Sequence, residues 1–261
     1  MLLVIDVGNT NIVTGIYENE KLLNVWRITT NKERTSDEFG VFFITMFSNV
    51  NIKMSDIKDV IISSVTPHIM YSLIHAIRKF FDCEPLLVEP GIKTGLHIKI
   101  DNPKELGADI IVNAVGAHEK YTGPLIVVDF GTATTLCAID TKNNILGVTI
   151  CPGVRVSADA LTQKAAKLPN IQIVKPKKVL GKNTVDSMQA GLVYGFVGQI
   201  DFLVNKIKEE MEEQGEQKEK IRVVATGGLA RLVATESTEI DEIDSMLTLD
   251  GLRIIHEKNK K

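Results

Sequence analysis

The sequence predicts an α/β protein made of two similar halves, on three observations. One pattern occurs twice: an apolar run ends in Asp-x-Gly and a second β-rich run follows, at Leu2–Thr10 and again at Leu125–Thr135. Each copy opens about half of the 261-residue chain. Strand-like and helix-like segments follow one another in both halves. We therefore expect two domains, residues 1–120 and residues 121–261, each with its own core and with a nucleotide bound in a cleft between them.

The first half is expected to begin with a β-meander, because short β-rich runs are separated there by turn residues. Apolar residues at helical spacing predict the helix over His68–Phe81. The expected elements, in order, are the strands Leu2–Ile5, Ile12–Tyr17 and Leu22–Ile28, a helix over Asp37–Phe47, a strand at Val60–Ser64, a helix over His68–Phe81, a strand at Pro85–Val88 and a helix from about Ala108 to Glu119.

The second half repeats the opening strands and then becomes more helical. Its longest expected helix carries one apolar stripe and two glycines four residues apart, Gly191 and Gly195, which we interpret first as packing within the chain and second as a dimer contact. The expected elements are the repeated strand-turn-strand from Leu125, a third strand near Ile145–Ile150, helices around Ser157–Gln163 and over Val185–Glu213, a strand at Arg222–Thr226, a short helix and a last helix from about Leu249 to Lys258.

Composition narrows the class of protein. Apolar residues make up 44% of the chain and charged residues 24%, with a formal net charge of −3, which is typical of a globular protein. Without a dense basic block, non-specific nucleic-acid binding has no electrostatic support. No segment reaches the roughly 20 apolar residues of a membrane span, and Asp6 interrupts the first apolar run, so we expect a cytoplasmic protein without a signal peptide.

Cysteine and histidine patterns argue against disulfides and zinc. The three cysteines, Cys83, Cys137 and Cys151, are widely spaced among apolar neighbours, which favours reduced thiols. Neither they nor the five histidines have zinc-ligand spacing. A metal ion, if one is used, should therefore be a hard cation bound by oxygen.

The first Asp-x-Gly turn is a candidate phosphate site. Gly8 permits a tight turn and close approach to a phosphate, Asn9 and Thr10 add donors, and Asp6 can hold Mg²⁺ directly or through water. The alternative is a turn aspartate that caps its own backbone, and for one isolated copy that alternative is favoured. The second copy of the motif reverses this preference.

The second turn offers Asp129 as a further carboxylate and a cluster of hydroxyls that includes Thr132. The β propensity of threonine explains Thr134 and Thr135 better than it explains an aspartate at a strand end. Further along, Thr226-Gly-Gly228 follows a strand and opens a helix. Its glycines either let a purine or ribose lie against the backbone or form a plain strand-to-helix turn.

Two helix starts carry further candidates. Asp109 follows Gly107-Ala108 and is either an N-cap or a general base that orients an attacking hydroxyl, and both roles are compatible with a helix N-terminus. Thr184 precedes the long helix and either caps it or points at a substrate, with the cap favoured.

Taken together, these motifs resemble those of the type III pantothenate kinases, in the superfamily of acetate and sugar kinases, heat-shock chaperones and actin. The similarity runs from end to end of the chain, with many motifs in one order. They are Asp6-Val-Gly-Asn-Thr, Arg34-Thr-x-Asp-Glu, Ser63-Ser64-Val65-x-Pro67, Pro90-Gly-Ile-Lys-Thr-Gly95, Asp101-Asn-Pro, Gly107-Ala-Asp109, Asp129-Phe-Gly-Thr-Ala-Thr-Thr135, Ala165-Ala-Lys-Leu-Pro169, Lys182-Asn-Thr184 and Thr226-Gly-Gly228.

The resemblance implies a fold, a reaction and ligands. The fold would be two duplicated actin-like (ribonuclease H-like) domains with mixed sheets. The reaction would be transfer of a phosphoryl group from ATP to the 4′-hydroxyl of pantothenate, the first step of coenzyme A biosynthesis. Mg²⁺ and a monovalent cation, K⁺ or NH₄⁺, would assist. The protein would be a homodimer with the active site at the subunit interface, and neither nucleic acid nor a membrane would be a partner.

The resemblance also implies residue roles. Asp109 would be the proton acceptor, Asp129 would hold the monovalent cation and Asp6 would serve Mg²⁺. Thr184 would contact pantothenate from the partner subunit. The segment that would bind the ATP phosphates is Asp6, Val7, Gly8, Asn9, Thr10, Asn11, Ile12 and Val13, with a further contact from Thr132, and the pantothenate-binding residues would be Ile100, Gly107, Ala108, Asp109, Ile110 and Thr184.

Two departures from the family pattern concern residues that would bind the acidic substrate pantothenate. The family usually has arginine where this chain has Ile110, and tyrosine where it has Ile100. Arginine is suited to a carboxylate such as that of pantothenate, and a hydrogen bond to a charged group contributes about 1.5–3 kcal/mol. Affinity for pantothenate would thus fall roughly 10- to 100-fold unless another group substitutes.

These departures leave two alternatives beside a pantothenate kinase. One is a nucleotide-binding homologue with weakened or lost kinase activity that acts as a regulatory or accessory protein. The other is a kinase for a more apolar, non-acidic alcohol. ATP binding without pantothenate-dependent turnover would indicate the first alternative, and a panel of substrates would identify the second.

Overall fold

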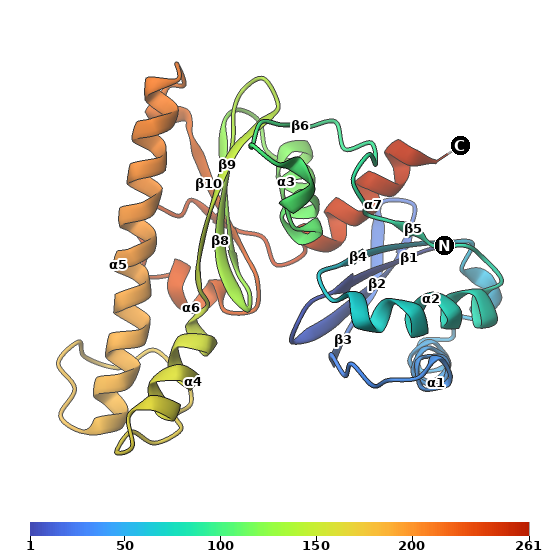
Figure 1. Ribbon diagram of the computed structural model, residues 1–261, viewed down its shortest axis with the longest axis horizontal. Coiled ribbons are helices and arrows are strands. Elements are labelled where there is room, and N and C mark those ends of the chain that lie inside the picture. The colour runs from blue at the N-terminus through green and yellow to red at the C-terminus, as the bar shows by residue number, and fades with distance from the viewer. Residues whose placement is uncertain (261) are drawn as a thin grey trace. The chain divides into compact units, whose positions relative to one another are not determined.

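The computed structural model describes residues 1–260 and divides into two compact units. The first unit comprises Met1–Gly95, Asn102–Gly116 and the chain from Thr248 onward. The second comprises Leu96–Asp101 and Ala117–Leu247. Each unit holds one mixed β-sheet covered by helices (Figure 1). The α/β class with two mixed sheets is therefore confirmed.

The sheet of the first unit is ordered β3-β2-β1-β4-β5. The strand β1 is central, pairing antiparallel with β2 and parallel with β4. Helices α1 and α2 pack against each other beside this sheet, and α3 begins in this unit. The bounds are β1 Leu2–Val7, β2 Asn11–Glu18, β3 Lys21–Thr29, α1 Ser36–Ser48, β4 Asp59–Ser64, α2 Pro67–Phe81, β5 Leu86–Leu87, α3 Ala108–Lys120 and α7 Leu247–Asn259.

Alternation along β1 explains how the first unit places Asp6. Leu3, Ile5 and Val7 belong to the buried core that the aromatic residues of α1 share. Because successive side chains of a strand point to opposite faces, Asp6 lies on the other face of the sheet. There the Tyr17 hydroxyl donates a 2.6 Å hydrogen bond to Asp250 of α7. The only carboxylate of β1 thus faces away from the aromatic core.

The second unit has the sheet order β11-β10-β7-β8-β9-β6. The long helix α5 carries an apolar stripe that includes Leu192, Phe196 and Ile200, which belongs to the core cluster of this unit. The bounds are β6 His97–Ile98, β7 Leu125–Phe130, β8 Ala133–Ile139, β9 Asn144–Pro152, α4 Val154–Lys164, α5 Thr184–Glu213, β10 Arg222–Thr226, α6 Ala230–Ala234 and β11 Glu242–Ile243.

The two sheets repeat one topology. Read from one edge, β3-β2-β1-β4-β5 corresponds to β9-β8-β7-β10-β11, with antiparallel pairs first and parallel pairs after the central strand. The strand β6 is an addition at the edge of the second sheet, where it pairs parallel with β9. The structural repeat agrees with the duplicated Asp-x-Gly motif.

Some local expectations differ from the structure. The strand β6 lies between Val88 and Ala108, where no strand is expected, and β9 extends to Pro152, two residues beyond the expected end at Ile150. The division of the chain is not a single cut near residue 120, because the last helix packs in the first unit. Within residues 1–260 no atom beyond the helix itself lies within 4 Å of a Cβ built on Gly191 or Gly195, so intrachain packing does not explain these glycines.

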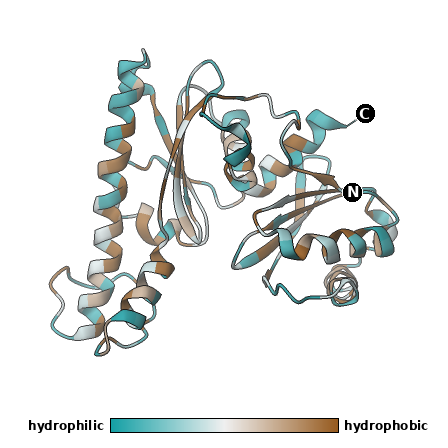
Figure 2. Ribbon diagram, in the orientation of Figure 1, coloured by the Kyte–Doolittle hydropathy of each residue, from teal (hydrophilic) through white to brown (hydrophobic). Residues whose placement is uncertain are grey.

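Among the described residues, no helix combines the length and apolarity needed to cross a membrane. Even the 30-residue α5 alternates hydrophilic and hydrophobic positions along its whole length (Figure 2).

Candidate functional site

The first Asp-x-Gly turn joins β1 to β2 and is fixed by two hydrogen bonds to the backbone of Gly8. The Gly8 N–H donates to the Asn11 carbonyl at 3.0 Å, and the Thr30 hydroxyl donates to the Gly8 carbonyl at 2.7 Å. A Cβ on Gly8 would lie 3.0 Å from the Asn11 carbonyl oxygen, so a side chain here would be tightly packed against the backbone of the turn. Asn9 and Thr10 are exposed at the tip. The turn thus presents backbone and polar side chains from a rigid frame.

Not every residue of segment 6–13 can offer a side chain to a ligand. Val7 and Ile12 have at most 1% of their surface exposed and belong to the core. Val13, like Asp6, is half-buried and lies opposite it in the antiparallel register. Val7 and Ile12 are therefore limited to backbone contacts with a nucleotide.

Asp6 lies among groups that oppose one another electrostatically. Its Oδ1 accepts a 2.8 Å hydrogen bond from the Ser63 hydroxyl. The pKa of Asp6 is raised to about 6, mainly because the side chain is buried and also because of the negative charge of Asp109. The hydrogen bond from Ser63 and the positive charge of Arg27 act the other way and lower the pKa. Two predicted site residues of the first unit, Asp6 and Asp109, are therefore near enough for the charge of one to raise the pKa of the other.

Asp109 is the second residue of α3. Its Oδ1 accepts a 2.9 Å hydrogen bond from the Ile110 N–H, and a Cβ on Gly107 would collide with that same carboxylate oxygen. Burial raises the pKa of Asp109, while the backbone N–H groups of the helix start lower it. The expected N-cap role is wrong, because the helix already begins at Ala108. The carboxylate is instead held within the first turn, in space that Gly107 leaves open.

Ile110 is buried, with 7% of its surface exposed. It follows the candidate base directly and offers no charge to an acidic substrate. Ile100 is half-buried and comes after β6, in the second unit, whereas Gly107–Ile110 belong to the first.

The second Asp-x-Gly turn joins β7 to β8. Asp129 lies opposite Thr226 of β10 in the parallel register. Gly227 has a φ of +96°, and a Cβ there would collide with the Asp129 carboxylate and with the backbone of Phe130. Thr132 is exposed at the turn, and its carbonyl accepts a 3.1 Å hydrogen bond from the Gly153 N–H. Gly227 therefore allows its own backbone to lie close to the Phe130 backbone and to the Asp129 carboxylate.

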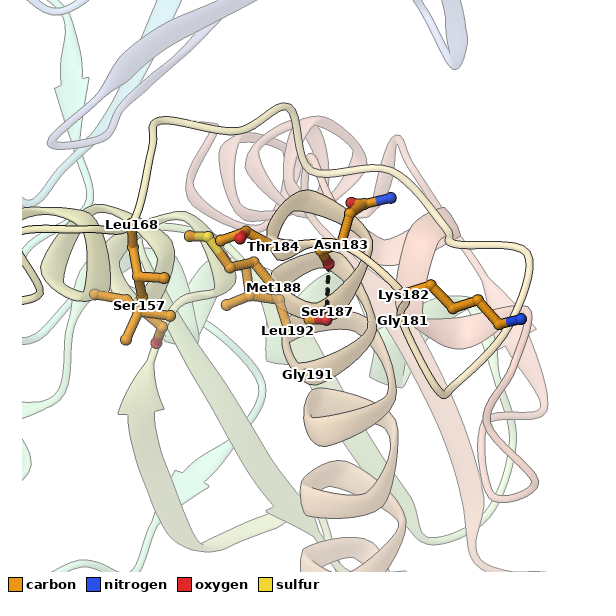
Figure 3. Close-up of a pocket in the computed structure, with 11 residues that line it drawn as sticks. Ser157, Leu168, Gly181, Lys182, Asn183, Thr184, Ser187, Met188, Gly191 and Leu192 are labelled. Atoms are coloured by element: carbon orange, nitrogen blue, oxygen red, sulfur yellow. Dashed lines mark hydrogen bonds between the residues drawn. The ribbon is translucent and has the colours of Figure 1, made fainter.

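Thr184 is the first residue of α5, and it lies on the rim of a pocket of about 760 Å³ in the second unit (Figure 3). The expectation that Thr184 caps the helix is wrong. Asn183 is the cap: its side chain accepts a 2.9 Å hydrogen bond from the Asp186 N–H. Its carbonyl also accepts a 2.8 Å hydrogen bond from the Ser187 hydroxyl. The threonine hydroxyl is thus not needed for capping.

Sequence reasoning missed the role of Ser63. In the sequence Ser63 is only one position of the Ser63-Ser64-Val65-x-Pro67 motif, whereas in the structure it is fully buried and donates a hydrogen bond to Asp6. The signal that identifies it is the parallel register of β1 and β4, which pairs Asp6 with Ser63. A strand partner 57 positions away is not readable from one sequence.

The donor set suits a hard cation that shares its ligands with a phosphate. Among residues 1–260, no group of three or more His, Cys, Asp and Glu side chains gathers to form a cage. Asp6 does have the Asp109 carboxylate near enough to raise its pKa. One or two carboxylates completed by water and phosphate oxygens are a usual arrangement for Mg²⁺, so the Asp6 carboxylate fits that ion.

The two mixed sheets of like topology, each with an Asp-x-Gly turn after its central strand, place the chain in the class of proteins with duplicated actin-like domains. The chain resembles a candidate 2-dehydro-3-deoxygalactonokinase from Sinorhizobium meliloti, with 12% identity, a TM-score of 0.62, and coverage of 100% of this chain and 97% of the other. It also resembles a Campylobacter jejuni protein described as a candidate Baf family transcriptional activator, with 20% identity, a TM-score of 0.55 and coverage of 98% of both chains. Identities this low demonstrate a shared fold alone.

The family itself follows from the sequence model of the type III pantothenate kinases, which matches residues 2–206. The match covers well over half of the chain. The protein belongs to the type III pantothenate kinase family, and as a kinase of this family it uses ATP.

Proposed function

We propose that the protein transfers the γ-phosphoryl group of ATP to the 4′-hydroxyl of pantothenate, the first step of coenzyme A biosynthesis. The observation that carries this proposal is the pair of carboxylates Asp6 and Asp109 in the first unit, one at the phosphate turn and one in the space beside Gly107. The family membership supports the substrate class.

In the proposed reaction, Asp109 accepts the proton of the attacking hydroxyl. The hydroxyl oxygen forms a bond to the γ-phosphorus, the bond to the β–γ bridging oxygen breaks, and ADP leaves. Phosphoryl transfer asks its base mainly to position the nucleophile, so a carboxylate held by the Ile110 N–H is sufficient. Asp6 would hold Mg²⁺, which neutralises charge on the phosphates when it is bound.

The second unit supplies further proposed contacts. Asp129, packed beside Gly227, is the proposed ligand of a monovalent cation, K⁺ or NH₄⁺. The exposed Thr132 is the proposed additional ATP contact. The cytoplasm is the proposed location, because ATP and reduced thiols are both found there.

A homodimer is also part of the proposal, with Thr184 of the partner subunit reaching pantothenate. Support comes from one face of α5, where Gly191 and Gly195 leave the backbone open. On the same helix Phe202 is 62% exposed. A contiguous open backbone beside an exposed aromatic residue is suited to close helix packing.

The test is a coupled assay of ADP release. Purified protein with ATP, Mg²⁺ and K⁺ should release ADP in proportion to added pantothenate, and mass spectrometry should detect the phosphorylated product. D109N keeps the shape of the side chain but removes the base, and we expect at least 100-fold lower turnover. D82N is the matched control, because Asp82 is exposed with a φ of 52°, a conformation that asparagine adopts readily.

Absence of pantothenate-dependent turnover in the intact protein would refute the proposal. If ATP still bound, the buried Ile110 would favour the regulatory homologue. If a non-acidic alcohol were phosphorylated instead, the protein would be a kinase for a more apolar substrate.

A further inference from the structure

The neighbourhood of Asp6 contains one more polar group, Ser63, whose side chain the proposed reaction does not use directly. Ser63 is the fifth residue of β4, and its surface is 0% exposed. The parallel pairing of β1 with β4 sets it directly beside Asp6. Side chains at paired positions project from the same face of a sheet, so the hydroxyl and the carboxylate meet there.

The contact between them is specific. The Ser63 hydroxyl donates to Asp6 Oδ1 at 2.8 Å, which is the length of a good O–H···O hydrogen bond. One carboxylate oxygen is therefore fixed by the protein, and Oδ2 is the oxygen that remains for a cation. Burial excludes water that would otherwise compete for the hydroxyl.

The adjacent serine has a different task. The Ser64 hydroxyl oxygen accepts a 3.1 Å hydrogen bond from the Thr66 N–H, in the turn that leads into α2. Of the two serines in β4, Ser63 thus contacts Asp6, whereas Ser64 makes only a local contact in the turn. This makes Ser64 a matched control for Ser63.

We infer that Ser63 is a positioning residue that orients the Asp6 carboxylate toward the divalent cation of the bound nucleotide. The inference rests on the proposed role of Asp6 in holding that cation. It extends the proposed function by a residue that touches neither the nucleotide nor pantothenate. An aspartate free to rotate would spend part of its time with neither oxygen aimed at the cation, which weakens binding.

The test measures Mn²⁺ binding to the protein in the presence of ADP. Binding is detected through the electron paramagnetic resonance signal of the free ion. We expect S63A to weaken Mn²⁺ binding about tenfold, which is the usual effect of losing an outer-shell partner, and S64A to remain within about twofold of the unaltered protein. S63T should restore binding because it keeps the hydroxyl. The second unit already accommodates Thr226, which is 1% exposed, at the corresponding place opposite Asp129.

Equal Mn²⁺ affinity of S63A and the unaltered protein would overturn the inference, as would S63T binding no better than S63A. If S63A does not fold, the pair S63T and S63V makes the same comparison, since threonine and valine have the same shape and only threonine donates. Pantothenate takes no part in this measurement. A failed pantothenate assay with an intact Ser63 effect would therefore refute only the proposed function, and the reverse result only the inference.

Discussion

The two Asp-x-Gly turns share a frame and differ in what the neighbouring parallel strand brings to the aspartate. In the first unit β4 ends in Ser63-Ser64, and the hydroxyl of Ser63 binds Asp6. In the second unit β10 ends in Thr226, and Gly227 follows at a positive φ against Asp129. One topology thus places the Ser63 hydroxyl on the carboxylate of the first copy and the closely approaching Gly227 backbone beside that of the second.

The difference indicates how two copies of one domain can take different roles. In the first unit the second carboxylate, Asp109, adds charge near Asp6. In the second unit the Gly227 backbone lies close to the Asp129 carboxylate. A divalent cation such as Mg²⁺ prefers carboxylate ligands, which is why the proposal assigns it to Asp6 in the first unit.

The largest expected effect comes from adding a side chain at Gly227, directly after β10. G227A forces a Cβ into the Asp129 carboxylate and the Phe130 backbone at a φ of +96°. Strain and overpacking together should destabilise the protein by about 4 kcal/mol. S64A, at the corresponding place in the first unit, removes only one hydrogen bond and should cost about 1 kcal/mol. Urea denaturation measures both, and equal losses would contradict the comparison.

A second prediction concerns the charge of Asp6. Its folded pKa of about 6 lies above the ordinary 3.8, so the folded state holds a proton more tightly than the unfolded state. Stability without metal should therefore fall as pH rises from about 4 to 6 and remain lower above, by up to about 3 kcal/mol. D6N removes this penalty and should be the more stable protein at pH 7.5 in EDTA, with the gap closing toward pH 4.

Thermal unfolding across this pH range measures the effect, and D82N provides an exposed control. A D6N variant less stable than the unaltered protein at pH 7.5 would mean that Asp6 is not destabilised by its surroundings. Mg²⁺ with ADP should stabilise the unaltered protein and leave D6N nearly unchanged.

A third prediction concerns Ile110, the residue that follows Asp109. I110R restores the arginine that the family usually has, and we expect it to lower the KM for pantothenate at least tenfold while the KM for ATP changes little. Because Ile110 is buried, the melting temperature of the variant must be measured in parallel. An unchanged KM would mean that another group of the protein already binds the carboxylate.

The smallest expected effects distinguish the roles of Asn183 and Thr184 at the start of α5. N183A removes the helix cap and should cost about 1 kcal/mol of stability with little change in KM. T184A should leave stability nearly unchanged and raise the KM for pantothenate. A loss of stability in T184A equal to that in N183A would show that the threonine has a structural role.

The sequence alone determined the α/β class, the duplication and nearly every long helix. Such features depend on local periodicity: the spacing of Leu192, Phe196 and Ile200 predicts one face of a helix wherever it packs. The Asp-x-Gly motifs likewise mark strand ends, because glycine is needed where a turn approaches its own backbone. The candidate residues Asp6, Asp109 and Asp129 follow from these patterns and from the family resemblance.

Only the tertiary structure decided which groups meet. The pairing of Asp6 with Ser63, the packing of Gly227 against Asp129 and the assignment of the last helix to the first unit all depend on strand register and on contacts distant in sequence. Local patterns also left the caps ambiguous, and the structure chose Asn183 over Thr184. The physical reason is that periodicity shows which face of an element is buried, whereas its partner is set by long-range packing.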